Sequence, residues 1–507
     1  MDDMEILSRF LRSNINIHPS ALEYLRKRDA EGIERVISEA ENGENIPEVL
    51  TLEYLKSIYD SPGIDGKEIE EENGEETQEV VVQRPRKRAL AEEYEAELEI
   101  RRDKDITKKS FSEGKLQSFL DYFNDRYDKL AKILRNRDTL RDATPIDWMK
   151  KSKGGVKIIG MVNEVKPTRK GHVIVELEDP TATIPILILN SNRELQGVAK
   201  ELVKDEVIGV EGNLGKDSDI IIAKEIFFPD VPVKNGLKKS QVPLALALVS
   251  DIHMGSTKFL EEDFLKFIKW LRGDLGTSRQ RELAGRVKYL IIGGDLVDGV
   301  GIYPGQESEL EIKDIYQQYK KLADYLTQVP DHVEIVVIPG NHDAARQAEP
   351  QPAIMEEFAP DFYKDPRVHM VGNPCYTMVH GVDVLSYHGR SLDDIISTMP
   401  DMSYSRPAKA MLALVKKRHL SPVYGGKVPL APEAMDYMLI EDTPDIFHVG
   451  HVHTAEVSNY RGVLLINSGT FQDQTSFQRK LNVIPTPGRI PIVDLQTQKT
   501  TIMRFDI

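Results

Sequence analysis

The chain has 507 residues, too many for one ordinary hydrophobic core, so we expect several domains. Its net charge of -16 argues against a protein that coats nucleic acid nonspecifically, and its single cysteine, Cys375, excludes both an internal disulfide and a cysteine-rich zinc site. No apolar run approaches the roughly 20 residues of a membrane span, and the acidic N-terminus is no secretory signal, so we expect a cytoplasmic protein without membrane contact.

The first 150 residues indicate three segments of different character. Residues 1–60 carry apolar side chains at helical spacing and predict a small helical module. Residues 61–110 are dominated by charge and have few large apolar side chains, so we expect a disordered linker. Residues 111–150 predict a connecting helix, because their apolar side chains recur at i, i+3, i+4 and i+7 on one face.

Between residues 151 and 238 the apolar pattern changes to the two-residue period of strands. Turn residues separate five short strands, which we place at residues 156–162, 173–177, 184–189, 207–210 and 220–227. Five strands of this length suit an oligonucleotide-binding (OB-fold) barrel. Such a barrel serves either as an interaction module or as a reader of nucleic acid, and the pattern leaves both open.

From residue 239 to residue 507, apolar strands alternate with helical segments, which predicts an α/β layered domain. We place its strands at residues 244–250, 289–293, 333–339, 382–387, 446–449 and 463–467. In layered α/β folds, functional side chains collect at the carboxyl ends of the strands. The residues that follow these strands are therefore the first candidates for a site.

Five of these strand ends carry oxygen or imidazole donors. The motifs are D-x-H at Asp251 and His253, G-D at Asp295, G-N-H-D at residues 340–343, H-G at His388, and G-H-x-H at residues 450–453. In an extended segment, residues i and i+2 point the same way, so each x-spaced pair presents both side chains to one site. A single histidine in such a place is more often a packing or capping residue, but five in this order indicate metal ligation.

The ordered set of motifs resembles that of the calcineurin-like metallophosphoesterases, from about residue 243 to the end of the chain. This resemblance implies a four-layer α/β sandwich and two divalent ions held by seven donors: Asp251, His253 and His453 on one ion, Asn341, His388 and His451 on the other, and Asp295 bridging both. It leaves His342 free for catalysis, with Asp343 fixing its tautomer. The mixed oxygen and nitrogen donors suit manganese, iron or zinc, of which we expect manganese.

A basic stretch lies between two of the expected ligands in the sequence. Residues 406–427 contain six Lys or Arg residues and no acidic residue, in a protein of net negative charge. This predicts contact with a phosphate backbone, although a helix with a solvated basic face is the alternative. We expect DNA contacts from seven residues: Arg346, Arg390, Arg406, Lys409, Lys416, Lys417 and Arg418.

Four stretches are similar to the small subunits of the archaeal D-family replicative DNA polymerases: GNHDAARQAEPQP at 340–352, YHGRS at 387–391, KRHLSPVYGG at 417–426 and PDIFHVGHVH at 444–453. The resemblance implies a proofreading 3'-5' exonuclease that belongs to a two-subunit polymerase. Its partners would be a large catalytic subunit and DNA 3' ends, single-stranded or mismatched. Two alternatives stay open: a non-catalytic scaffold for the polymerase, and a repair nuclease or phosphatase of the same superfamily.

Overall fold

The structure is a computed structural model that describes residues 88–149, 155–215, 219–233, 238–480 and 482–506, with short pieces at 16–17, 21, 25 and 49–50. The chain divides into two units, Met1–Pro85 and Arg86–Ile507. In the first unit, β1 (Asn16–Ile17) pairs in parallel with β2 (Val49–Leu50). The predicted helical module at 1–60 and most of the predicted linker lie outside the described residues.

The predicted boundary of the linker, at residue 110, lies too far along the chain. Within residues 88–110, η1 (Leu90–Glu93) and η2 (Arg102–Lys104) flank β3 (Leu98–Ile100), which pairs antiparallel with β13 (Cys375–Val379). The prediction of disorder is therefore wrong for this stretch. Its apolar side chains Tyr94, Ala96, Leu98 and Ile100 alternate with glutamates and pack on the core. This is the two-residue period of a strand, but the high charge of the segment favoured the prediction of disorder.

Two six-stranded sheets form the centre of the second unit. The first sheet has the order β12 (Val368–Met370), β11 (Glu334–Ile338), β10 (Val287–Gly293), β9 (Ala245–Val249), β18 (Arg489–Asp494) and β19 (Thr500–Arg504). The second has the order β16 (Glu456–Tyr460), β17 (Val463–Asn467), β15 (Ile446–Val449), β14 (Val382–Tyr387), β13 and β3. Strands β9 to β12 are parallel to one another, as are β14, β15 and β17.

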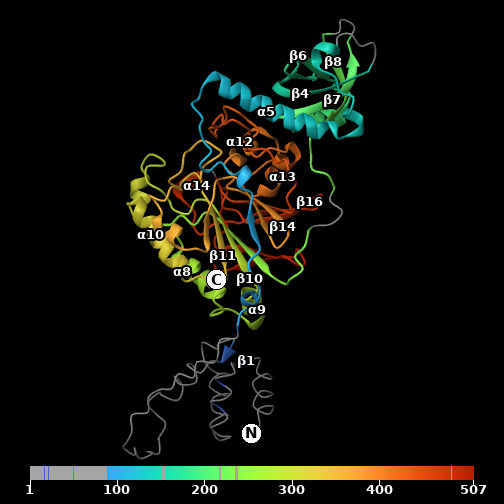
Figure 1. Cartoon of the computed structure of the whole chain (residues 1–507). Helices are drawn as coiled ribbons and strands as arrows, with labels where there is room; N and C mark the ends of the chain where they lie inside the picture. Colours follow the sequence, from blue (N-terminus) through green and yellow to red (C-terminus); the bar gives the residue numbers. More distant parts are fainter. Residues whose placement is uncertain are drawn as a thin grey trace, which may run out of the picture. The chain divides into compact units, whose positions relative to one another are not determined.

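Helices cover the outer faces of both sheets, so the unit has four layers (Figure 1). The first sheet packs against α8 (Glu261–Leu271), α9 (Ser278–Ala284), α10 (Ile315–Leu326) and α11 (Pro360–Lys364). The second packs against α12 (Leu392–Thr398) and α13 (Pro407–Lys417). Alternate residues point to opposite faces of a strand, so β9 sends Leu246 and Leu248 between the sheets and Ala245 and Ala247 toward the helices.

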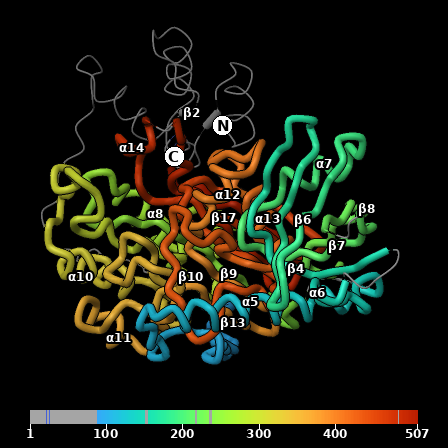
Figure 2. The backbone as a smooth tube through the Cα atoms, turned by 90° about the horizontal axis from the view of Figure 1, so that it is seen from above, coloured from blue at the N-terminus to red at the C-terminus, as the bar shows by residue number. Residues whose placement is uncertain are grey.

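The predicted five-stranded barrel is present and closed. It consists of β4 (Gly155–Pro167), β5 (Val173–Glu178), β6 (Thr183–Ile188), β8 (Ile221–Phe227) and β7 (Val207–Leu214), with α6 (Ile146–Met149) and α7 (Arg193–Ala199) packed on it (Figure 2). Alternate strand residues such as Val175, Leu177 and Ile186 fill its interior. The predicted connecting helix is α5 (Leu116–Arg135), whose apolar face packs on β4 and β7.

The barrel, α5 and the helical side of the second sheet meet at a buried polar cluster, which we call the seam: Arg126, Glu206, Lys417, His419 and Asp436. The Arg126 Nε donates to Asp436 Oδ2 at 2.8 Å, and the His419 Nε2 lies 2.7 Å from the same oxygen. The Lys417 Nζ donates to Glu206 Oε2 at 2.9 Å. The seam therefore joins the barrel to the layered part by paired charges.

In the described residues, no helix has both the length and the apolarity that crossing a membrane requires.

Candidate metal centre

The seven predicted ligands converge from both sheets, because each follows the carboxyl end of a parallel strand. Asp251 and His253 follow β9, Asp295 follows β10, and Asn341 follows β11. From the second sheet, His388 follows β14, and the pair His451 and His453 follows β15. The strand-end prediction is thus confirmed for the position of these residues in the fold.

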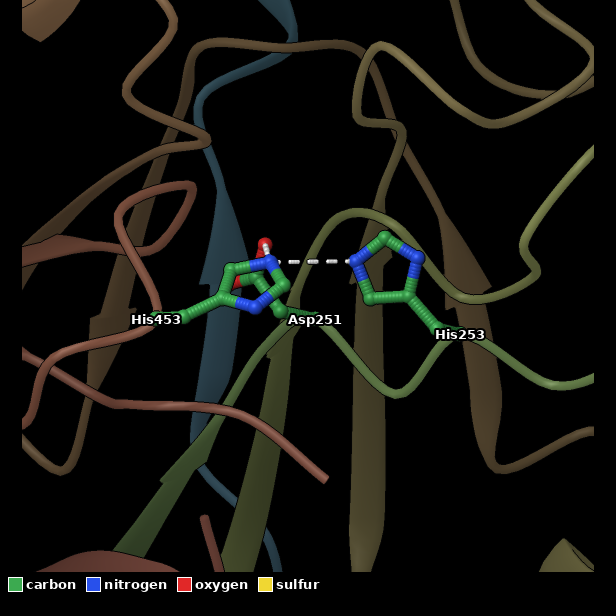
Figure 3. Close-up of side chains that lie close together, drawn as sticks. All are labelled: Asp251, His253 and His453. Atoms are coloured by element: carbon green, nitrogen blue, oxygen red, sulfur yellow. Dashed lines mark hydrogen bonds and ion pairs between the residues drawn. The ribbon is translucent and has the colours of Figure 1, made fainter. Parts of the chain in front are cut away.

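Three of the predicted ligands form one group (Figure 3). The His253 Nε2 lies 3.1 Å from the His453 Nε2, and the His453 Nε2 lies 3.4 Å from Asp251 Oδ1. All three residues are buried. Two imidazole nitrogens and a carboxylate oxygen at these separations form a set of donors that one transition-metal ion could bind.

A second group contains Asp295, His388 and His451, whose donor atoms all lie within 4.8 Å of one another. Asn341 joins it, because its Oδ1 lies 3.0 Å from the His388 Nε2. The Asp295 Oδ2 lies 3.3 Å from the His388 Nε2 and 3.8 Å from the His253 Nε2. Asp295 therefore lies between the two groups, where a bridging ligand has to be.

Outer contacts orient the imidazoles of both groups. The His253 Nδ1 lies 3.0 Å from Asp298 Oδ1, and the His388 Nδ1 lies 2.9 Å from the Gly293 carbonyl oxygen. The Gln478 side-chain amide lies 2.8 Å from the His453 Nδ1. These contacts fix the three rings so that the Nε2 atoms of His253, His388 and His453 face the centre, as partners of metal-binding histidines ordinarily do.

Sequence reasoning missed three of these orienting residues: Asp298, Asp393 and Gln478. Asp393 Oδ2 lies 3.2 Å from the His451 Nε2, and its other oxygen accepts from the Tyr404 hydroxyl at 2.8 Å. Asp298 could have been suspected, because it follows Asp295 by three residues in the same strand-end loop. Gln478 had no such signal, since it belongs to a distant short helix.

The backbone at the ligands is unusual. Asp251, His253, Asp295, His451 and His453 all have positive φ, between 50° and 68°. Residues other than glycine seldom adopt this left-handed conformation, which costs on the order of 1 kcal/mol or more each. Such conformations cluster at functional sites, where the surrounding structure holds them in place.

Two glycines beside the ligands are required by close approach. A Cβ atom on Gly340 would lie 2.2 Å from Asp295 Oδ1, and one on Gly450 would lie 2.6 Å from Asp251 Oδ2. No larger residue fits at either position without moving a ligand. Close packing against a predicted ligand therefore explains why glycine precedes Asn341 and His451.

The centre is electrostatically suited to cations. Burial alone would raise the pKa of Asp295, but the imidazoles of His388 and His342 hold it well below its ordinary value. Burial likewise opposes charge on His388, yet Asp295 and Asp251 raise the pKa of His388 to about 10. The two buried carboxylates thus attract positive charge onto the imidazole of His388. A pair of divalent ions would satisfy the same carboxylates, and the mixed oxygen and nitrogen donors fit such ions.

The structure revises the role predicted for Asp343. Its oxygens accept from the backbone N–H groups of Gly340 and Leu296 and from the Tyr319 hydroxyl. The residue that contacts His342 is Asp298, whose backbone carbonyl oxygen lies 2.8 Å from the His342 Nδ1. Asp343 therefore shapes the loop that carries Asn341 and His342, and it does not fix the tautomer of His342.

The predicted DNA-binding residues do not share one surface. Lys417 and Arg418 are buried: Lys417 pairs with Glu206 in the seam, and Arg418 donates to Thr443 Oγ1 and the Glu441 carbonyl. The prediction that these two contact DNA is contradicted, because the end of α13 is buried under the barrel. The neighbouring Lys416 pairs with Glu201 at 3.1 Å.

The other four basic residues lie in different settings. Arg406 and Lys409 are exposed on α13. Arg346 is tied to Glu433 at 2.6 Å and to the Pro350 carbonyl. Arg390 donates to the Gln347 carbonyl at 2.8 Å, and Gln347 in turn donates to the Asn341 carbonyl. Arg390 is thus the basic residue joined to the centre through one intermediate side chain.

Comparison with known proteins places the chain in a family. Residues 246–458 match the family of the B subunits of DNA polymerases alpha and epsilon. The DNA polymerase II small subunit of Archaeoglobus fulgidus is 43% identical over 97% of this chain and 96% of its own length. That of Methanothermobacter thermautotrophicus is 39% identical over 98% of both chains, and that of Halobacterium salinarum is 42% identical over 80% of this chain and 78% of its own. The chain therefore belongs to the family of archaeal DNA polymerase II small subunits.

Proposed function

We propose that this chain is the metal-dependent 3'-5' exonuclease of a two-subunit DNA polymerase and removes mismatched nucleotides for a larger catalytic subunit. The observation that carries the proposal is the convergence of seven donor side chains, in two groups joined by Asp295, at the strand ends of two packed sheets. We further propose that the four layers are those of a calcineurin-like phosphoesterase and that the barrel is an OB-fold.

Asp251, His253 and His453 would hold one ion, and Asn341, His388 and His451 the other, with Asp295 between them. When bound, two divalent ions supply Lewis-acid chemistry to a phosphodiester, and manganese is our expectation for activity, with iron or zinc as alternatives.

His342 is the residue best placed to move a proton. Its Nδ1 is held by the Asp298 carbonyl and its backbone N–H donates to Asp295 Oδ1 at 2.8 Å, so the ring is fixed beside the bridging carboxylate. The ring centre lies 4.7 Å from that of His253. Because the Asp298 carbonyl can only accept, Nδ1 carries the proton of the neutral ring, and the free Nε2 can take up a proton from water and pass it to the departing 3' oxygen.

DNA is the proposed substrate because the relatives are polymerase subunits by name and because basic residues lie near the centre. Arg390 reaches the Asn341 loop through Gln347, and it would meet a phosphate of the bound strand. Such a strand would be the single-stranded or mismatched 3' end of a primer.

The test is an exonuclease assay on the full chain together with its large subunit. With manganese present, labelled single-stranded and mismatched primers should shorten from the 3' end. The variant His342→Ala should lose this activity and still co-purify with the large subunit.

Two results would contradict the proposal. Hydrolysis of small phosphoesters without DNA shortening would favour a phosphatase of the same superfamily. A wild-type complex with no hydrolytic activity in any metal would favour the scaffold alternative.

A further inference from the structure

The rim segment, which we define as residues 473–480 and 482–486, lies beside the candidate metal centre and carries exposed apolar and basic side chains. It includes the short helix α14 (Ser476–Lys480), labelled in Figure 1. Phe477 is 65% exposed and Ile484 is 73% exposed. One exposed apolar side chain on a soluble protein needs no explanation, but two in one short segment next to a ligand call for one.

The rim segment is anchored at the predicted ligand His453 by its short helix and by its C-terminal end. The Gln478 side-chain amide lies 2.8 Å from the His453 Nδ1, and the Thr486 backbone N–H donates to the His453 carbonyl at 2.8 Å. Ser476 Oγ also donates to Glu309 at 2.6 Å. The backbone at Phe477 is therefore held on one side by Ser476 at Glu309 and on the other by Gln478 at His453.

We propose that Phe477 stacks on the base of the terminal nucleotide that the centre removes, while Arg479 and Lys480 contact phosphates of the same strand. This inference rests on the proposed exonuclease function and names the part of the substrate that the rim recognises. Phe477 is a positioning residue in this account, since it touches the base and not the bond that breaks.

The charge and chemistry of the rim segment favour a nucleic acid strand as its occupant. Arg479 and Lys480 are exposed, and their side chains have no acidic partner among the residues that the structure describes. Aromatic side chains next to cationic ones are the usual platform for single strands, because every base offers a face for stacking and every phosphate a negative charge. The buried Lys417 and Arg418 cannot take this role.

The experiment compares Phe477→Ala with the wild-type full chain in manganese. Two substrates are used: a labelled single-stranded oligodeoxynucleotide and bis-p-nitrophenyl phosphate, a phosphodiester without bases. Stacking on one base is worth enough that kcat/KM for DNA, relative to that for the small diester, should fall about 5- to 100-fold. The loss should appear mainly in KM, and Phe477→Trp should restore it.

A strand whose 3'-terminal nucleotide lacks its base isolates the stacking contact. The wild-type protein should lose about as much on this strand as Phe477→Ala loses on the normal one, and the variant should lose little more. The matched control is Leu275→Ala, another exposed apolar residue, in the segment between α8 and α9. It should behave like the wild-type protein.

Two outcomes overturn the inference while the proposed function stands: DNA cleavage by Phe477→Ala equal to the wild type, or the same fold loss on normal and base-free 3' ends. A wild-type protein that shortens no DNA overturns the proposed function, and the inference with it.

Discussion

The candidate metal centre and the seam both bury several charged side chains, but only the seam pairs its carboxylates with Lys and Arg. There, Arg126 and His419 contact Asp436, and Lys417 contacts Glu206. At the centre, Asp251 and Asp295 face imidazoles, with no Lys or Arg paired to them in the described part of the chain. Carboxylates that are paired with Lys or Arg can hold the barrel and the layered part together. Carboxylates and imidazoles without such partners are suited to binding metal ions.

The largest effect is expected from Asp295→Asn. Loss of the bridging carboxylate should abolish DNA hydrolysis, a drop of at least about 1,000-fold, because both donor groups lose their shared anion. Thermal unfolding should check the cause: manganese should raise the melting temperature of the wild-type protein and not that of the variant.

The matched control is Asp331→Asn, whose carboxylate is fully exposed. It should keep both the activity and the stabilisation by manganese. Hydrolysis at wild-type rate by Asp295→Asn would show that Asp295 is not a ligand.

In the seam, Lys417→Met should destabilise the fold and leave the candidate metal centre intact. Glu206 would be left buried without a cationic partner, at a cost of about 3–5 kcal/mol in the free energy of unfolding measured in urea. The double variant Lys417→Met with Glu206→Leu should recover most of this loss.

Lys409→Met, on the exposed side of the same helix, is the control and should change stability little. If Lys417→Met instead kept full stability and weakened DNA binding, Lys417 would face DNA and our account of the seam would be wrong.

Acid should weaken the seam. Burial, helped by the charge of Arg126, lowers the pKa of His419 to about 4. Between about pH 6.5 and pH 4 the unfolded chain therefore binds a proton that the folded chain does not, so stability falls as pH falls through this range, by up to about 3 kcal/mol. Below that range Asp436 adds to the loss. Although burial raises its pKa, His419 and Arg126 hold it well below the ordinary value.

Urea unfolding at several pH values, with and without His419→Gln, measures this contribution. Chelator should be present in all samples, so that metal release does not contribute. The variant should show a flatter slope between pH 4 and pH 6.5, and an unchanged slope would refute the assignment.

The smallest effects are expected from Arg406→Ala and Lys409→Ala. Both side chains are exposed on α13, so each should weaken DNA binding only a few-fold and reduce the salt dependence of binding by about one counterion. Fluorescence anisotropy over a range of salt concentrations measures both quantities. An unchanged affinity in the double variant would remove α13 from the DNA-binding surface altogether.

The sequence alone was enough to predict α5, the barrel, the strand-end donors and six of the twelve strands in the two six-stranded sheets, namely β9, β10, β11, β14, β15 and β17. These features depend on residues close together in the chain: a two-residue period marks a strand, a 3.6-residue period marks a helix, and a donor after a buried strand lies at a sheet edge. The two carboxylates and five imidazoles that follow such strands needed no tertiary information to be suspected.

Only the tertiary structure showed which charged residues lie at the candidate metal centre and which are buried in the seam between the barrel and the layered part. Lys417 and Glu206 are 211 residues apart and Arg126 and Asp436 are 310 apart, so no local pattern marks Lys417 as a buried partner of the barrel. The same holds for Gln478, which reaches His453 from a separate helix. The local sequence identifies the donor residues, because each donor directly follows its own strand. Their orientation and the burial of the basic residues arise from contacts between distant elements, which periodicity does not encode.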